Sequence, residues 1–179
     1  MTEAKPRVPA LEGLFKLGPE PDLDACLIGS QCADCGSYFF PRERVQCRNP
    51  RCRSVTLVEC ELSTEGTLWS YTSSEYKPPA PYVAAEPFEP FAIAAVELEL
   101  EKLVVLGQVI AGVAAADLKI GMTMRLVSAV LDEDENCARM VWKWAPKAAS
   151  AAPSAPRSSG LGASGSGASG ADAPTLGGQ

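Results

Sequence analysis

Four of the seven cysteines are spaced as ligands of a single metal ion. Cys32 and Cys35 form a Cys-x2-Cys pair, and Cys47 and Cys52 form a Cys-x4-Cys pair. A structural zinc ion takes four soft ligands in tetrahedral geometry, and two cysteine pairs on separate turns commonly supply them. Gly36 follows the first pair and suits the tight turn that such a site requires. We therefore predict one structural Zn2+ per chain, with a rubredoxin-type iron site or no metal as the alternatives.

The residue inventory restricts what chemistry the chain can perform by itself. Four thiolates fill the coordination shell of zinc, so the site leaves no position for a catalytic water. Histidine is absent from the sequence, which excludes self-contained Ser-His and Cys-His mechanisms. An independent enzyme would have to use a carboxylate or Cys137, and we regard this as a minor alternative. The catalytic residues of any associated reaction are expected in another chain.

Charge and hydropathy restrict the expected cellular compartment and the expected classes of binding partner. The net charge is −6 and the isoelectric point is about 4.8, which argues against nucleic acid as the main partner. No apolar run approaches the roughly 20 residues that span a bilayer, and the first residues do not resemble a signal peptide. We therefore expect a cytoplasmic protein without a membrane partner. In a reducing compartment its cysteines serve as metal ligands or buried thiols.

The segments that must position the four cysteines are mainly β. Apolar residues between 8 and 27 are grouped loosely at helical spacing and predict one or two short helices. Strands are predicted at 55–62, 66–74, 91–100, 103–110, 122–131 and 137–144. Within 55–62, Val58 and Leu62 are expected on the buried face, and the apolar run 103–110 predicts burial on both faces. A five- to six-stranded OB-type barrel accommodates these strands best.

These patterns predict four regions along the chain. They are an N-terminal helical segment at 1–31, a zinc ribbon at 32–53, an OB-fold at 54–147 and a disordered Ala/Gly/Ser/Pro tail at 148–179. Residues 113–122 predict a helical turn that ends in a reversal at Gly121. The segment 75–90 contains five prolines among sixteen residues, so we predict no strand there.

Two groups of side chains are candidate contacts with a partner or with acyl-CoA. The ribbon carries five arginines against Asp34 and Glu43. Three of these arginines, Arg44, Arg48 and Arg51, could bind an acidic partner or the phosphates of a nucleotide-like ligand, although they could also simply offset the thiolates. Tyr82 and Phe88 lie in the Pro-rich segment, where no core requires aromatic side chains.

The order of these parts resembles a known family. The relevant sequences are CADCGSYFFPRERVQC, GTLWSYT, VVLGQVI and DLKIGM, within about residues 10–146. They are similar to the zinc-ribbon OB-fold proteins that accompany thiolases, thiolase-like synthases and enoyl-CoA hydratases. Within that family the chain is most similar to the small subunit of the benzoylsuccinyl-CoA thiolase of anaerobic toluene degradation.

The resemblance implies a non-catalytic subunit of a heteromeric acyl-CoA thiolase. The thiolase-type subunit would supply the nucleophilic cysteine and the histidines, and this chain would help to form or cover the acyl-CoA site. The nearest alternative is an accessory subunit of an enoyl-CoA hydratase or a thiolase-like synthase. A ribbon and barrel that bind single-stranded nucleic acid form a third interpretation.

Overall fold

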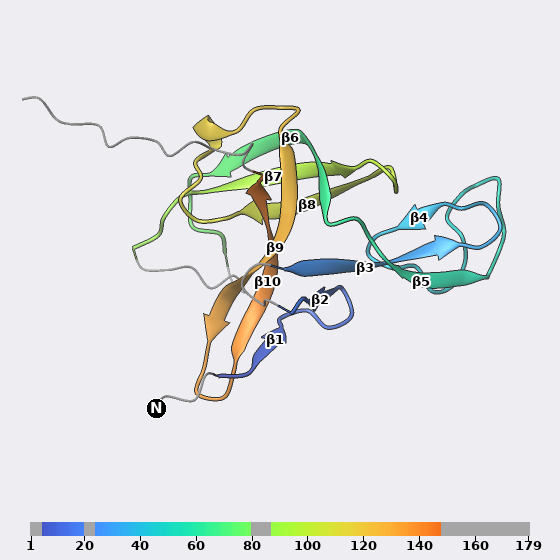
Figure 1. Cartoon of the computed structure of the whole chain (residues 1–179), viewed down its shortest axis with the longest axis horizontal. Coiled ribbons are helices and arrows are strands. Elements are labelled where there is room, and N and C mark those ends of the chain that lie inside the picture. Colours follow the sequence, from blue (N-terminus) through green and yellow to red (C-terminus); the bar gives the residue numbers. More distant parts are fainter. Residues whose placement is uncertain (1–4, 20–23, 80–86, 148–179) are drawn as a thin grey trace, which may run out of the picture. The chain divides into compact units, whose positions relative to one another are not determined.

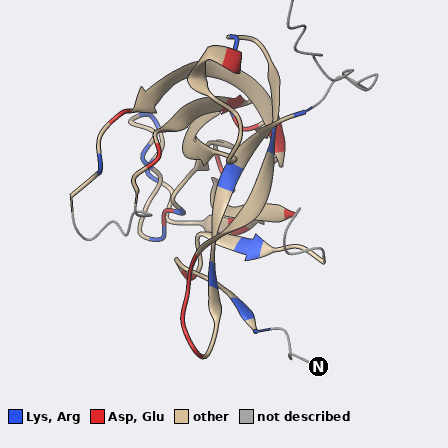
Figure 2. Ribbon diagram, turned by 90° about the vertical axis from the view of Figure 1, so that its left-hand side faces the viewer, with Lys and Arg blue, Asp and Glu red and all other residues tan. Residues whose placement is uncertain are grey.

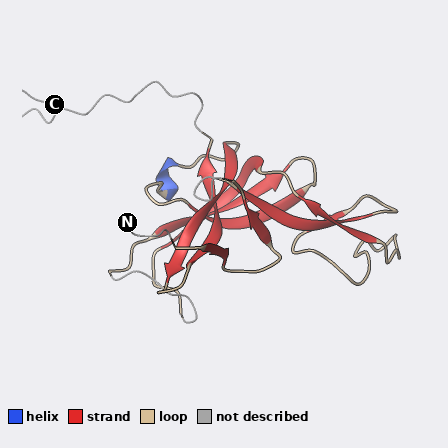
Figure 3. Cartoon of the chain, turned by 60° about the horizontal axis from the view of Figure 1, so that its bottom comes forward, coloured by secondary structure: helices blue, strands red, loops and turns tan. Residues whose placement is uncertain are grey.

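The computed structural model describes residues 5–19, 24–79 and 87–147, and nearly all of its regular structure is β (Figure 1, Figure 3). Its strands are β1 (Arg7–Pro9), β2 (Phe15–Leu17), β3 (Ala25–Cys32), β4 (Tyr38–Phe39), β5 (Leu57–Glu61), β6 (Glu65–Ser74), β7 (Phe91–Leu98), β8 (Leu103–Val109), β9 (Thr123–Glu133) and β10 (Ala138–Pro146). A 3-10 turn, η1 (Ala115–Asp117), lies between β8 and β9. None of the helices in these ranges is long and apolar enough to cross a membrane.

Five strands close into a barrel with the connectivity of an OB-fold. Neighbouring strands pair in the order β10-β8-β7-β6-β9, and β9 pairs with β10 to complete the ring. The β8–β10 pair is parallel, whereas β6–β7, β7–β8, β6–β9 and β9–β10 are antiparallel. Alternating apolar residues provide one inward face on each strand. The predicted OB-type barrel is therefore confirmed, and so is the helical turn with its reversal at Gly121, which has φ 88°.

The barrel core is built from large apolar side chains that are withdrawn from solvent. Its fully buried members include Leu68, Val96, Leu98, Met124, Met140 and Trp144. Gly66 allows the close approach of β6 and β7, since a Cβ atom there would lie 2.4 Å from the Glu97 carbonyl oxygen. The close packing of the core thus depends on the glycine at position 66 as well as on the apolar residues.

The N-terminal helices predicted between residues 8 and 27 are not present, because the described part of this segment forms β1, β2 and β3. Gly13, at φ 72°, breaks the apparent helical spacing between Leu11 and Phe15. The stretches that remain are too short for a stable helix but long enough for strand pairing. In β3, Ala25 and Leu27 are buried and pair across to β2.

β3 also serves the ribbon, because its second half pairs antiparallel with β4 and β5. Aromatic contacts connect this region to the barrel. The ring of Trp142 in β10 lies 5.6 Å from that of Phe15 and 6.0 Å from that of Phe40, both edge to face. Such pairs contribute about 1 kcal/mol each beyond their buried area.

Two predictions of burial are wrong. Val104 and Leu106 in β8 are 48% and 64% exposed, although the unbroken apolar run predicted burial on both faces. In a barrel only one face of each strand points inward, and no described helix covers the outer face of β8. Val58 in β5 is likewise 55% exposed, whereas Leu62 is buried as predicted. The described parts of 75–90 contain no strand, and residues 80–86 and the predicted tail lie outside the described residues.

Candidate metal centre

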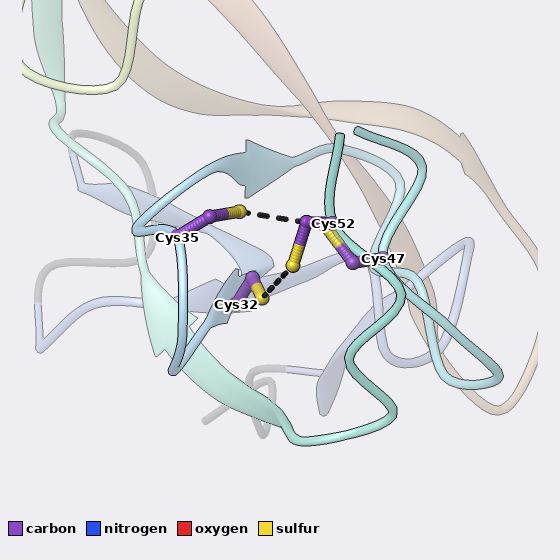
Figure 4. Close-up of side chains that lie close together, drawn as sticks. All are labelled: Cys32, Cys35, Cys47 and Cys52. Carbon is purple, nitrogen blue, oxygen red and sulfur yellow. Dashed lines mark hydrogen bonds between the residues drawn. The ribbon is translucent and has the colours of Figure 1, made fainter. Parts of the chain in front are cut away.

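The four cysteines come from three separate pieces of chain. Cys32 ends β3, Cys35 follows in the turn before β4, and Cys47 and Cys52 lie in the loop between β4 and β5. Their side chains converge on one small volume (Figure 4), and all four Sγ atoms lie within 4.8 Å of one another. No other group of three or more metal-ligating side chains is found in the described part of the chain.

The distances between the sulfur atoms suit a tetrahedral ion. The Sγ atoms of Cys32 and Cys52 are 3.8 Å apart, and those of Cys35 and Cys47 are 3.5 Å apart. Four sulfurs at the usual Zn–S distance of about 2.3 Å would be separated by about 3.8 Å. The four sulfur ligands therefore fit zinc, and they leave no open coordination position at which a water molecule could be activated.

The longer spacing of the second pair does not disturb this geometry. The N–H of Cys52 donates to the Asn49 carbonyl at 2.9 Å, and the N–H of Arg51 donates to the Asn49 side-chain oxygen at 3.0 Å. The additional residues thus close a turn that returns the chain to Cys47. In the first pair, Gly36 at φ 72° donates its N–H to the Cys32 carbonyl at 2.9 Å. Both turns are accordingly defined by the backbone as well as by the cysteines.

Hydrogen bonding and burial act differently on the individual thiols. The hydroxyl of Ser37, 3.3 Å from the sulfur of Cys35, and the Ser37 backbone lower the pKa of Cys35 to about 6. Burial instead raises the pKa of Cys47 to about 12. Collecting such thiols as anions in one buried cluster is unfavourable without a cation at its centre.

Comparisons with known proteins agree with this architecture. The family model described as "ChsH2, C-terminal OB-fold domain" matches residues 59–129, from β5 into β9. A DUF35 domain-containing scaffold protein of Methanocaldococcus jannaschii is 34% identical over 113 residues, which cover 61% of this chain and 72% of the relative. The chain belongs to the DUF35 family. This confirms the family resemblance seen in the sequence.

Two further comparisons place this DUF35 chain among its relatives. A DUF35 domain-containing scaffold protein of Methanothermobacter thermautotrophicus is 42% identical over 65 residues, which are 33% of this chain and 47% of that protein. Among solved structures, a chain of the Ltp2-ChsH2(DUF35) aldolase matches with a TM-score of 0.51 and 25% identity. That match covers 69% of this chain and 86% of the other.

The predicted arginine contacts lie on the surface of the ribbon. Arg44 and Arg51 are exposed and form no ion pair with any described residue, whereas Arg48 pairs with Glu43. Arg53 is also exposed, and so are two valines of this region, Val45 at 75% and Val55 at 71%, none of which was among the predicted contacts. Apolar residues in a predicted ribbon look like candidates for burial, so the sequence carried no signal of their exposure.

No interaction among the described residues brings the predicted aromatic contact Phe88 together with the predicted arginine contacts. Phe88 is half-buried and packs edge to face on Phe91 at 6.2 Å, so it is not a freely exposed ring. Tyr82 lies outside the described residues. Trp69 in β6 is 61% exposed, and Leu106 and Val104 in β8 are 64% and 48% exposed.

Electrostatics distinguish the ribbon from the barrel. Residues 54–147 contain fourteen acidic and seven basic side chains, whereas the ribbon has an excess of arginine. Four consecutive acidic residues, Asp132, Glu133, Asp134 and Glu135, lie at the turn of the β9–β10 hairpin, which is red in Figure 2. An acidic barrel wall does not suit a phosphate backbone, which counts against the single-stranded nucleic-acid interpretation.

Proposed function

We propose that this DUF35 chain is a non-catalytic, zinc-binding subunit of a heteromeric acyl-CoA enzyme of the thiolase type. Its role is to help form or cover the acyl-CoA site of a catalytic partner. Cys32, Cys35, Cys47 and Cys52 would hold the zinc ion, which supplies structural cross-linking of the ribbon. The chain's own residues provide docking surface and no nucleophile.

Membership of the DUF35 family carries this proposal. The curated relatives are named scaffold proteins, and the solved neighbour is an aldolase in which a DUF35 chain is combined with Ltp2. The absence of histidine from the sequence supports the same division of labour. A thiolase reaction needs an activated cysteine and a proton acceptor, and neither is assembled in the described part of this chain.

The ribbon is the proposed contact surface. Arg44 and Arg51 present guanidinium groups without carboxylate partners among the described residues, and Val45 adds exposed apolar area. Guanidinium groups bind carboxylates and phosphates in bidentate geometry. This combination fits an acidic face of the catalytic subunit at or near the phosphates of acyl-CoA. The likeness to the small subunit of benzoylsuccinyl-CoA thiolase makes an aromatic acyl-CoA the first substrate to test.

Co-expression with a candidate thiolase-like catalytic subunit tests the proposal. We expect a stable hetero-oligomer on size-exclusion chromatography, with thiolase activity only when both chains are present. The double variant Arg44→Glu/Arg51→Glu should weaken the complex at least about tenfold, while Lys119→Glu on the barrel should not. A chain that remains a monomer beside a folded thiolase-like protein, with no effect on its activity, would refute the assignment.

A further inference from the structure

β5 is the outermost strand of the ribbon sheet. It pairs antiparallel with β3 on one side, and no strand of the described ranges pairs with its other side (Figure 1). An open edge of a sheet presents a row of backbone N–H and C=O groups that can pair with another extended chain. The outer edge of β5 is therefore a directional surface whose chemistry is set by the backbone.

Two hydrogen bonds beyond the ends of β5 show which residues direct their backbone groups outward. The N–H of Ala33 donates to the Thr56 carbonyl, and the N–H of Leu62 donates to the Leu27 carbonyl, each at 3.0 Å. In an antiparallel pair, successive residues direct their backbone groups alternately toward the partner strand and away from it. The even-numbered residues of this segment thus face β3. The residues that direct N–H and C=O groups away from β3 are Leu57, Glu59 and Glu61.

The chain itself does not satisfy these outward groups. They form no hydrogen bond with any residue that the structure describes. Proteins usually protect an open edge with proline, a bulge or an unpaired charge. β5 contains no proline, and its pairing with β3 has no bulge. The carboxylates of Glu59 and Glu61 are held within the chain by Arg42 and Lys16. β5 thus lacks the usual protection against an added strand.

The side chains beside this edge indicate which kind of strand it would accept. Val55 and Val58 are 71% and 55% exposed, so they favour apolar side chains on a neighbouring strand. Arg51 and Arg53, directly before β5, are exposed and form no ion pair with a described residue, so they favour carboxylates. A second copy of this chain fits less well. Pairing along the whole of β5 would place Glu59 directly opposite its own counterpart, and like charges in that position are unfavourable.

We propose that β5 accepts an extended segment of the catalytic subunit as an additional strand of the ribbon sheet. The segment carries apolar residues at alternate positions, where they meet Val58, and an acidic residue at the end beside Arg53. The three outward N–H groups and three outward C=O groups bind its backbone, and the flanking side chains select its sequence. The inference rests on the proposed function for the identity of the partner, and it adds how the ribbon holds that partner.

Amide hydrogen exchange at residue resolution tests the added strand directly. In the free, zinc-loaded chain, the amides of Leu57, Glu59 and Glu61 should exchange at least about tenfold faster than those of Val58 and Cys60, which face β3. In a co-purified complex with a thiolase-like subunit, the three outward amides should slow at least about tenfold. A stable complex in which they exchange as fast as in the free chain would overturn the inference and leave the proposed function intact.

A proline at the first position of β5 provides a second measurement. Leu57→Pro removes one outward N–H without removing a hydrogen bond to β3, and proline is tolerated at the first residue of an edge strand. Leu57→Ala is the matched control, since it shortens the same side chain and retains the N–H. The proline variant should bind the catalytic subunit at least about tenfold more weakly than the alanine variant. Equal affinities of two zinc-loaded variants would contradict the added strand. If the proline variant lost its zinc, the exchange rates would decide.

A synthetic peptide separates this inference from the proposed function. The probe is a peptide of about eight residues that alternates valine and glutamate, and its control is the same peptide N-methylated at alternate residues. At millimolar concentration only the unmodified peptide should shift the amide resonances of Leu57, Glu59 and Glu61 in the full chain. If the peptide bound in this way but no thiolase-like subunit did, only the proposed function would fail. If neither bound, both would fail. A free chain that dimerises with these amides protected would show that a second copy occupies the edge, which would also overturn the inference.

Discussion

Gly107 lies against the indole ring of Trp144 so closely that no side chain can be placed there. A Cβ atom at Gly107 would be 2.9 Å from Cδ1 and 3.0 Å from Nε1 of the Trp144 ring. Trp144 is fully buried at the centre of the barrel, and Gly107 belongs to β8, the parallel neighbour of β10. The Trp144 ring can therefore pack in this position only because Gly107, on the neighbouring strand, has no Cβ atom.

Gly107→Ala should consequently destabilise the barrel. The ring of Trp144 is enclosed by packed residues and cannot shift freely, so we expect a loss of about 1 to 3 kcal/mol in the free energy of unfolding. Urea denaturation followed by tryptophan fluorescence measures it. Val104→Ala, on the exposed face of the same strand, is the matched control and should stay within about 0.5 kcal/mol of wild type. Equal stability of the two variants would contradict the packing seen here.

Cys35→Ser should release the metal and unfold the ribbon. A hydroxyl is a much poorer zinc ligand than a thiolate, and small sites of this kind fold on metal binding. We expect zinc content to fall from about one equivalent to well under half, as measured by metal analysis of the purified chain. Cys137→Ser, outside the cluster, should keep its zinc. Wild-type protein purified with neither zinc nor iron would count against the site.

Glu101→Ala should loosen the junction between ribbon and barrel. Glu101 is 6% exposed, and one of its carboxylate oxygens accepts hydrogen bonds from the Ser63 N–H at 2.7 Å and the Ser63 hydroxyl at 2.9 Å. Removal of the acceptor leaves these donors unsatisfied, which costs about 1 to 3 kcal/mol. Amide hydrogen exchange at Ser63 and chemical denaturation report the change.

Two neighbouring substitutions separate the effect of the acceptor from that of the charge. Glu101→Gln retains an acceptor oxygen and should lose less stability than the alanine variant. Glu99→Ala removes an exposed carboxylate nearby and should have little effect. If Glu99→Ala were as damaging as Glu101→Ala, charge in the hairpin rather than the Ser63 contacts would be responsible.

The β9–β10 turn should weaken in acid. The carboxylate of Asp134 accepts hydrogen bonds from the N–H groups of Cys137 and Asn136 and pairs with Arg139, and these contacts lower its pKa. Because the folded pKa lies below the unfolded value, its stabilisation is complete at neutral pH and is lost as the pH falls through the folded pKa.

Asp134→Asn therefore should be less stable than wild type at pH 7, and the difference should shrink below the ordinary Asp range of about pH 4. Urea midpoints of both proteins across this pH range provide the measurement. Glu135→Gln, at an exposed position of the same turn, should show no comparable pH dependence. A difference that grew toward acid pH would reverse the expected sign.

Local pattern was sufficient to predict the strands of the barrel, since their alternation and their Gly turns are properties of short segments. Local pattern failed where contacts with distant residues determine the secondary structure or the exposure of a segment. The Phe15 segment has apolar residues at several spacings, and pairing with Leu27 of β3 selects a strand. Leu106 is apolar yet exposed because only one face of a barrel strand points inward. Neither fact is present in the neighbouring residues.

The metal site was predictable to a larger extent than the contact surface. Cysteine spacing restricts which side chains can meet, so the cluster of Cys32 with its three partners follows from the sequence. Whether an arginine is available to a partner depends on whether folding places a carboxylate beside it, as it places Glu43 beside Arg48.

The dual role of β3 limits how this family can vary in length. Its first half pairs with β2, and its second half pairs with β4 and β5 and ends at Cys32. One inserted residue would move the later half by roughly 3.3 Å and turn its side chains to the opposite face. Insertions and deletions among homologues should therefore avoid these eight residues. They should accumulate in the loop before Cys47 and in the Pro-rich segment after β6.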